Sequence, residues 1–101
     1  MSTYLHKAAQ QNRIDIVKWL IDNGAKANSK DRMHKTALHI ASENNYPEVV
    51  KLLIQDHRNQ DGALTDLRDK DGYNSLDYAL INNSSLEVVK WLLKELKHQG
   101  I

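Results

Sequence analysis

Histidine is the side chain here best suited to bind a metal ion or to act as a general base. The chain has five, His6, His34, His39, His57 and His98. No two of them stand four residues apart on an expected helix, and no carboxylate cluster completes a metal site beside them. His6 and His39 lie within strings that recur along the chain, which favours a structural role for both. We expect the other three to be exposed, and we expect neither a metal ion nor a cofactor.

Residues 69–72 (DKDG) superficially resemble part of a calcium loop. In an EF-hand alignment the first and twelfth positions would be Leu67 and Tyr78, where the loop needs an acid and a bidentate glutamate. A tight turn explains the segment better, because aspartate side chains accept hydrogen bonds from nearby backbone N–H groups and Gly72 tolerates positive φ. We therefore expect no calcium site.

Groups for covalent catalysis are missing from the sequence. It contains no cysteine, no Gly-x-Ser-x-Gly elbow and no glycine-rich phosphate loop. The lysines of residues 90–97 are interrupted by Glu95, and their period fits the solvated side of a closing helix. Trp19 and Trp91 occupy equivalent positions beside leucines, so we expect core packing rather than a stacking platform. The chain is predicted not to be an enzyme.

Composition indicates one small globular domain. The chain has 101 residues, 41% hydrophobic and 27% charged, and a formal net charge of +1. So small a charge gives no overall field to attract nucleic acid or an anionic membrane. Its longest apolar runs are too short to span a bilayer, and residues 1–4 carry no apolar signal core. We expect a cytoplasmic protein that binds neither nucleic acid nor membrane.

Internal repeats in the sequence indicate the helices and turns that carry these residues. A first string occurs three times, as LHKA (5–8), TALHIA (36–41) and LDYA (76–79). A second string follows each copy, as DIVKWL (15–20), EVVKLL (48–53) and EVVKWL (87–92). Self-similarity at a period near 33 residues is typical of a solenoid, so function is expected on a surface rather than in a pocket.

Each repeat reads as two helices followed by a protruding hairpin. Leu38 and Ala41 form the narrow apolar stripe of a short first helix, and Pro47 suits the first position of the second helix. Asparagines at equivalent places (12, 45 and 83) are expected to end the first helices in the left-handed conformation. Gly24 and Gly62 then stop the second helices, and Asp31 and Asp69 begin the turns.

On these motifs the chain resembles the ankyrin-repeat family over residues 2 to 98. The resemblance implies an all-α solenoid of stacked helix-turn-helix units joined by β-hairpin-like loops, in a single domain covering residues 1–101. It predicts repeats at about 2–30, 31–68 and 69–98. It also implies that His6 and His39 bond to the backbone of neighbouring hairpins.

Several positions depart from the family pattern. Ala37 and Ser75 replace proline, His34 replaces a hairpin glycine, and Asp77 replaces the motif histidine. The first hairpin is therefore expected to be strained or differently shaped. Five extra residues fall near 55–61, where they lengthen the second helix or form a loop bulge. Two interpretations stay open: the insertion belongs to a binding face, or it is a lengthened loop without function.

The resemblance places a partner along the hairpin tips and the outward side of the first helices. The matching positions are Gln10, Gln11, Glu43, Asn44, Ile81 and Asn82 on the first helices, and Lys30, Arg32, Met33, Lys35, Arg68, Lys70, Asp71 and Tyr73 on the hairpins. Met33, Tyr73 and Ile81 are candidate apolar anchors, although scattered apolar residues are also normal on surfaces. The excess of basic residues favours a partner with an acidic segment.

The predicted function is a non-catalytic protein–protein interaction module. An inhibitor or immunity-type protein, or an assembly chaperone that masks a partner's active surface, are the alternatives. We expect a monomer, with weak self-association through the apolar helix at residues 76–81 as an open alternative to inward packing of Tyr78 and Leu80.

Overall fold

Six helices make up the regular structure in the computed structural model, which describes residues 2–55 and 65–98. Within these residues there is no strand, and the helices are α1 (Tyr4–Gln10), α2 (Ile14–Asp22), α3 (Ala37–Glu43), α4 (Pro47–Ile54), α5 (Ser75–Ile81) and α6 (Leu86–His98). The expected all-α architecture is confirmed. Pro47 opens α4, as its missing N–H favours. Most of the five-residue insertion, together with Gly62 and His57, lies outside the described residues.

The first helix of each pair begins with the same reciprocal cap. Thr3, Thr36 and Asn74 each accept a hydrogen bond from the backbone N–H three residues on. The side chain at that third position accepts in return from the cap's own N–H, and it belongs to His6, His39 and Asp77 respectively. Asp77 thus keeps the capping role of the histidine that it replaces. Two otherwise unpaired N–H groups are satisfied at each helix start.

Asparagine ends these three helices, as expected from the sequence. Asn12, Asn45 and Asn83 have φ of 55°, 54° and 53°. The N–H after each asparagine then bonds back to the carbonyl oxygen five residues earlier, for example from Arg13 to Ala8 at 3.0 Å. This left-handed turn satisfies carbonyl groups at the helix end and reverses the chain toward the second helix.

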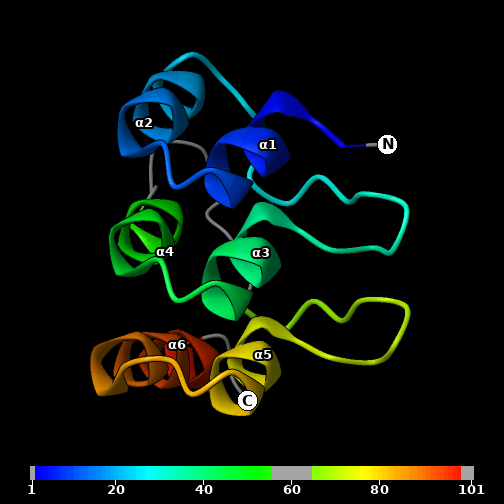
Figure 1. Ribbon diagram of the computed structural model, residues 1–101, viewed down its shortest axis with the longest axis vertical. Helices are drawn as coiled ribbons and strands as arrows, with labels where there is room; N and C mark the ends of the chain where they lie inside the picture. Colours follow the sequence, from blue (N-terminus) through cyan, green and yellow to red (C-terminus); the bar gives the residue numbers. More distant parts are fainter. Residues whose placement is uncertain (1, 56–64, 99–101) are drawn as a thin grey trace.

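The helices form two layers, shown in Figure 1. Helices α1, α3 and α5 stack in one column and α2, α4 and α6 in the other, while the two hairpins project to one side of the first column. The core lies between the layers and between successive repeats; its largest fully buried apolar side chains are Val17, Leu38, Val49, Val50, Leu53, Val88 and Leu92. The hairpins and the exposed side of α1, α3 and α5 therefore border one continuous surface.

Candidate functional site

Each hairpin is held by the aspartate that precedes its turn. In the first, Oδ1 of Asp31 accepts hydrogen bonds from the backbone N–H groups of Met33 (2.8 Å) and Lys35 (2.9 Å). Asp69 makes the same two bonds in the second hairpin, to the N–H groups two and four residues on. Both predicted turns are confirmed, and in each one a single carboxylate joins the two arms of the hairpin.

The two hairpins share one backbone shape despite their different sequences. His34 has φ of 61° and Gly72 has φ of 85°, so histidine occupies a left-handed position that glycine fills in the other turn. The tips are also joined, because the N–H of Lys70 donates to the carbonyl oxygen of Met33 at 2.9 Å. Met33 and Lys70, two predicted binding residues, are therefore adjacent.

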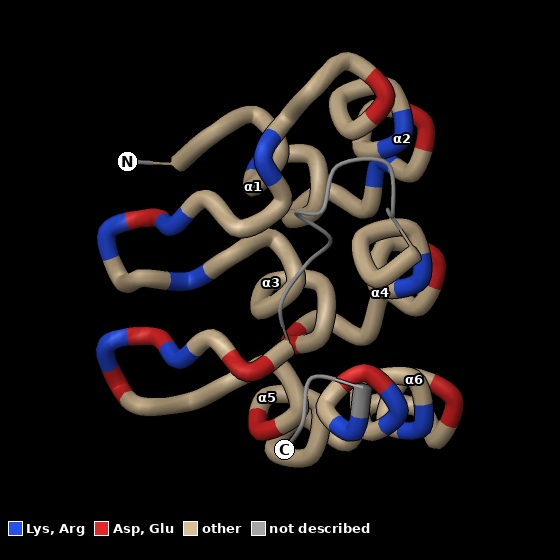
Figure 2. Tube along the Cα trace, turned by 180° about the vertical axis from the view of Figure 1, so that it is seen from behind, with Lys and Arg blue, Asp and Glu red and all other residues tan. Residues whose placement is uncertain are grey.

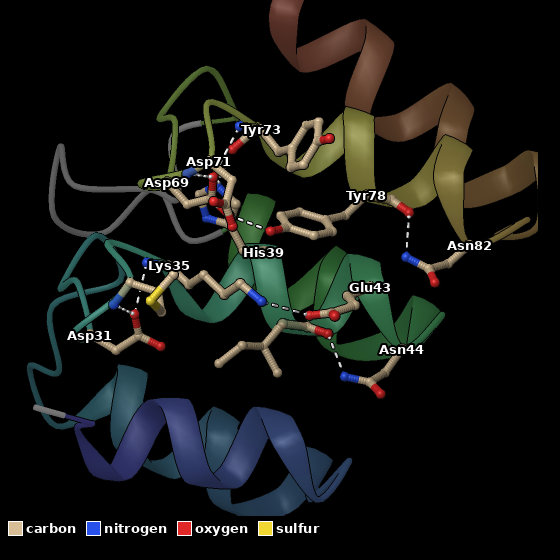
Figure 3. A network of polar contacts seen from close by, with 12 residues as sticks. Asp31, Lys35, His39, Glu43, Asn44, Asp69, Asp71, Tyr73, Tyr78 and Asn82 are labelled. Atoms are coloured by element: carbon tan, nitrogen blue, oxygen red, sulfur yellow. Dashed lines mark hydrogen bonds and ion pairs between the residues drawn. The ribbon is translucent and has the colours of Figure 1, made fainter.

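His39 and Tyr78 attach the second hairpin to the helices (Figure 3). Nε2 of His39 donates to the carbonyl oxygen of Tyr73 at 3.0 Å, and His6 makes the equivalent bond to the carbonyl oxygen of Lys35 at 2.8 Å. Both histidines thus have the structural role that the resemblance implied. The hydroxyl of Tyr78 donates to Asp69, and the rings of Tyr73 and Tyr78 meet edge to face at 5.6 Å.

The pKa shifts follow from this packing. Burial raises the pKa of Tyr78, and the adjacent Asp69 carboxylate raises it further, so the hydroxyl remains a donor. Burial alone would also raise the pKa of Asp69. Hydrogen bonds from Tyr78 and from two backbone N–H groups outweigh that effect and hold the pKa of Asp69 below its usual value. Asp69 is therefore a structural carboxylate.

Some predicted binding residues already have partners within the protein. Nζ of Lys35 lies 3.3 Å from Oε2 of Glu43 and 4.9 Å from the centre of the Tyr78 ring. The side-chain amides of Asn44 and Asn82 donate to carbonyl oxygens of their own helices, at 2.8 Å and 3.0 Å. These contacts are drawn in Figure 3. They orient the side chains at the surface and reduce the capacity of Lys35 to pair with a partner's charge.

An open hollow of about 310 Å³ lies between the first hairpin and α1 and α3. Three predicted residues, Met33, Lys35 and Glu43, border it together with the predicted flanking glutamines 10 and 11. Lys7 and Ile40 also line the hollow. Neither was predicted from the sequence, although they occupy the same position in successive repeats.

The predicted apolar anchors are exposed but not all adjacent. Met33 and Tyr73 are 43% and 42% exposed, one on each hairpin. Ile81 is also exposed, but the whole of α5 separates it from Tyr73. Tyr78 is buried, whereas Leu80 is exposed, so only the tyrosine packs inward. The structure thus brings Met33 and the second hairpin together and leaves Ile81 with Asn82 at the far end of α5.

Charged residues at the hairpin tips are mainly basic, and Figure 2 shows their distribution along both loops. Arg32 is exposed beside Met33, and Lys70 and Asp71 are exposed in the second tip. Arg68 bonds to the carbonyl oxygen of Gly72 at 2.7 Å and lies 3.6 Å from Asp77. Asp31 and Asp69 accept hydrogen bonds within the turns, whereas the side chains of Arg32 and Lys70 are exposed.

One expectation about helix surfaces is wrong. Trp19 was expected in the core but is 61% exposed, while Trp91 is half-buried against the core with Nζ of Lys51 5.9 Å from its ring centre. On α6, Lys90, Lys94 and Lys97 are exposed as expected for a solvated outward side, but Leu86 and Leu93 are exposed as well. Burial at these positions depends on a neighbouring helix that one repeat cannot specify.

Among residues 2–55 and 65–98, no group of three or more histidine, aspartate or glutamate side chains is placed to hold a metal ion. In the same part of the chain, no helix is both long and apolar enough to cross a bilayer.

Comparison with known proteins decides the family, because the model for ankyrin repeats, in three copies, matches residues 5–100. The chain belongs to the ankyrin-repeat family. Ankyrin repeats are protein-interaction modules and are generally not catalytic, and no catalytic family is indicated for this ankyrin-repeat protein.

Its relatives are diverse and longer. A putative ankyrin repeat protein of fowlpox virus is 33% identical over 93 residues, covering 91% of this chain and 26% of its own length. Human protein phosphatase 1 regulatory subunit 27 is 37% identical over 73 residues, covering 66% and 47%. The human transient receptor potential cation channel subfamily A member 1 is 34% identical over 94 residues, covering 93% and 8%. This chain therefore spans less than half the length of each of these relatives.

Proposed function

We propose that this ankyrin-repeat protein binds a partner protein through a concave strip made of both hairpin tips and the exposed sides of α1 and α3. The observation that carries the proposal is that Met33 and Tyr73, two half-exposed apolar side chains, lie on hairpins that are joined at their tips and braced by Asp31 and Asp69. A preorganised apolar contact loses little conformational entropy on binding, so such residues are favoured as interface anchors.

The charge of the strip suggests the chemistry of the partner. Arg32 precedes Met33 and is exposed, Lys70 is exposed on the second tip and bonds to the Met33 backbone, and Lys7 borders the neighbouring hollow. A partner segment with acidic residues around an apolar side chain fits this arrangement. The basic residues would chiefly increase the association rate, and raising the salt concentration would reduce that increase.

The test begins with capture of the partner from the native source and its identification by mass spectrometry. The double variant Met33→Ala/Tyr73→Ala should then bind it with a loss of more than about 1 kcal/mol by calorimetry. Trp19→Ala is the matched control, because it truncates an exposed aromatic group on α2. Circular dichroism must show that each variant remains folded. Unchanged affinity in the folded double variant would remove Met33 and Tyr73 from the interface.

A second candidate is regulation of an enzyme by masking its active surface. One relative is named as a regulatory subunit of protein phosphatase 1, and it matches 66% of this chain. If the captured partner is an enzyme, the wild-type chain should inhibit its turnover at concentrations near the measured Kd. The double variant should inhibit only at correspondingly higher concentrations. Full turnover of the saturated complex would exclude masking and leave the binding proposal intact.

A further inference from the structure

The last repeat exposes the side that the other repeats use for stacking. Ile21 and Ile54, which directly follow the second string in their repeats, are 4% and 8% exposed, whereas the equivalent Leu93 is 48% exposed. Helix α4 packs on α2, and α6 packs on α4. The outward side of α6 is therefore equivalent to the sides of α2 and α4 that are covered by the next helix.

The same comparison extends this surface to α5. Ala9 and Ser42 are fully buried, but the equivalent Leu80 is 57% exposed. Leu86 is exposed at the start of α6, and Val89 is only half-buried although the equivalent valines, 17 and 50, are fully buried. We call Leu80, Leu86, Val89 and Leu93 the end face. Among the described residues no helix covers this apolar surface, whereas its counterparts are each covered by the next repeat.

Lysines border the end face on one side. Lys90, Lys94 and Lys97 are exposed and have no ion pair among the residues that the structure describes. Together with Trp91 and Leu93 they line an open hollow of about 420 Å³ along α6. Figure 2 shows the Lys positions of α6 interspersed with its Glu positions. Positive charge beside an apolar stripe favours an occupant with apolar and acidic residues on adjacent sides.

A second copy of the chain is a poor occupant. Two end faces placed together would bring both sets of three lysines close to each other. Head-to-tail stacking would place Tyr4 of one copy near Leu80 of the next. Within the molecule, the positions equivalent to Tyr4 are Ala37 and Ser75, both almost completely buried against the preceding repeat. Large side chains at a junction that is otherwise built from small ones prevent the close approach of the helices.

We propose that the end face binds an amphipathic helix of a partner protein, with its apolar side on Leu80, Leu86 and Leu93 and its acidic residues along Lys90, Lys94 and Lys97. A single bound helix would extend the column of α2, α4 and α6, packing on α6 as α6 packs on α4. It does not need the close approach of an inner helix at Leu80. This surface is separate from the concave strip, so both partners can bind at once.

The probe is a synthetic 18-residue helical peptide with leucines three and four residues apart and glutamates on one flank. A control peptide carries lysine in place of each glutamate. Binding is followed by the fluorescence of Trp91, which borders the hollow, in a Trp19→Phe background. The glutamate peptide should bind at least tenfold more tightly than the lysine peptide. Lys94→Glu/Lys97→Glu should abolish or reverse this preference.

Further variants locate the contact. Leu80→Ser/Leu93→Ser should weaken binding of the glutamate peptide at least tenfold, and since both residues are exposed the fold should persist. Ile16→Ser, on α2 in the first repeat, is the matched control and should bind as wild type. Met33→Ala/Tyr73→Ala should also bind the peptide as wild type, which separates this surface from the concave strip.

Four outcomes would overturn the proposal. The first is equal affinity for the two peptides, and the second is unchanged affinity after Leu80→Ser/Leu93→Ser. The third is a molecular mass that rises with concentration and is restored to the monomer by the same double variant, because a second copy then covers the end face. Binding to phosphatidylserine vesicles without binding to the glutamate peptide is the fourth, and it would assign the surface to lipid.

Discussion

The imidazole of His39, on α3, bonds both to the residue that caps this helix and to the second hairpin. Nδ1 accepts from the N–H of Thr36 at 3.0 Å, which caps α3, and Nε2 donates to the carbonyl oxygen of Tyr73 in the second hairpin. An accepting Nδ1 and a donating Nε2 define the neutral ring. Burial lowers the pKa of His39, against an opposing effect of the Tyr73 carbonyl, so the folded protein keeps this neutral form. The hairpin that carries Tyr73 is thus positioned by a side chain in the preceding repeat.

The lowered pKa predicts a pH dependence of stability. In the unfolded chain His39 takes up a proton near its ordinary pKa of 6.5, whereas the folded state resists protonation. The contribution of His39 is therefore complete above about pH 6.5 and is lost progressively as the pH falls below it. Urea unfolding should show a lower free energy of unfolding at pH 5 than at pH 7. His39 should titrate below 6.5 by NMR; titration at or above that value would contradict the assignment.

At the scale of elements, the two junctions between inner helices differ in chemistry. The small residues at the α1/α3 junction are Ala9 and Ala37, whereas Ser42 and Ser75 occupy the equivalent positions at α3/α5. Both serines are fully buried, and neither hydroxyl has a hydrogen-bond partner among the described residues. A buried hydroxyl without a partner is destabilising, because it loses its hydrogen bonds to water. The side chains at the α3/α5 junction are therefore as small as those at the α1/α3 junction, but they are polar.

Replacing both serines by alanine should stabilise the protein. Ser42→Ala/Ser75→Ala copies the α1/α3 junction and removes two unpaired hydroxyls while adding no volume. We expect the free energy of unfolding to rise by about 1 kcal/mol per site, measured by chemical denaturation. Ser84→Ala is the control, because its hydroxyl donates to the carbonyl oxygen of Ser42 at 2.9 Å and its loss should destabilise. A less stable double variant would show that the serine hydroxyls are satisfied in solution.

At the scale of the whole molecule, the middle repeat holds the array together. Helix α3 packs against α1, α4 and α5, so both terminal repeats depend on it. Leu38, on α3, is fully buried in the core. Three repeats are near the smallest number that supports a stable array, so neither end is expected to persist when the middle unfolds.

Unfolding should therefore be cooperative from end to end. Trp19 reports on the first repeat in a Trp91→Phe background, and Trp91 reports on the last in Trp19→Phe. The two probes should give the same denaturant midpoint. Leu38→Ala should lower the free energy of unfolding by about 3 kcal/mol and shift both midpoints equally. Separate midpoints for the two tryptophans would show that the repeats unfold independently.

Features that depend on local chemistry and on recurrence could be predicted from the amino-acid sequence. The repeated strings indicated stacked helix pairs, Asn12, Asn45 and Asn83 indicated the left-handed helix ends, and Asp31 and Asp69 indicated the turns. Each depends on a few adjacent residues, whose backbone preferences act in any context. The positions of Met33 and Tyr73 on hairpins could be predicted for the same reason, once the repeat was aligned.

Which side chains are covered depends on how the repeats pack together. Lys35 and Glu43 were both predicted to face a partner, but the fold pairs them with each other. Trp19 was predicted to be buried and is exposed, and Leu93 is exposed where its equivalents Ile21 and Ile54 are buried. In a stack, the burial of a residue depends on the presence of a neighbouring repeat as well as on its own type. Recurrence therefore predicts the scaffold, while the exposed surfaces, including the end face, appear only when the repeats are assembled.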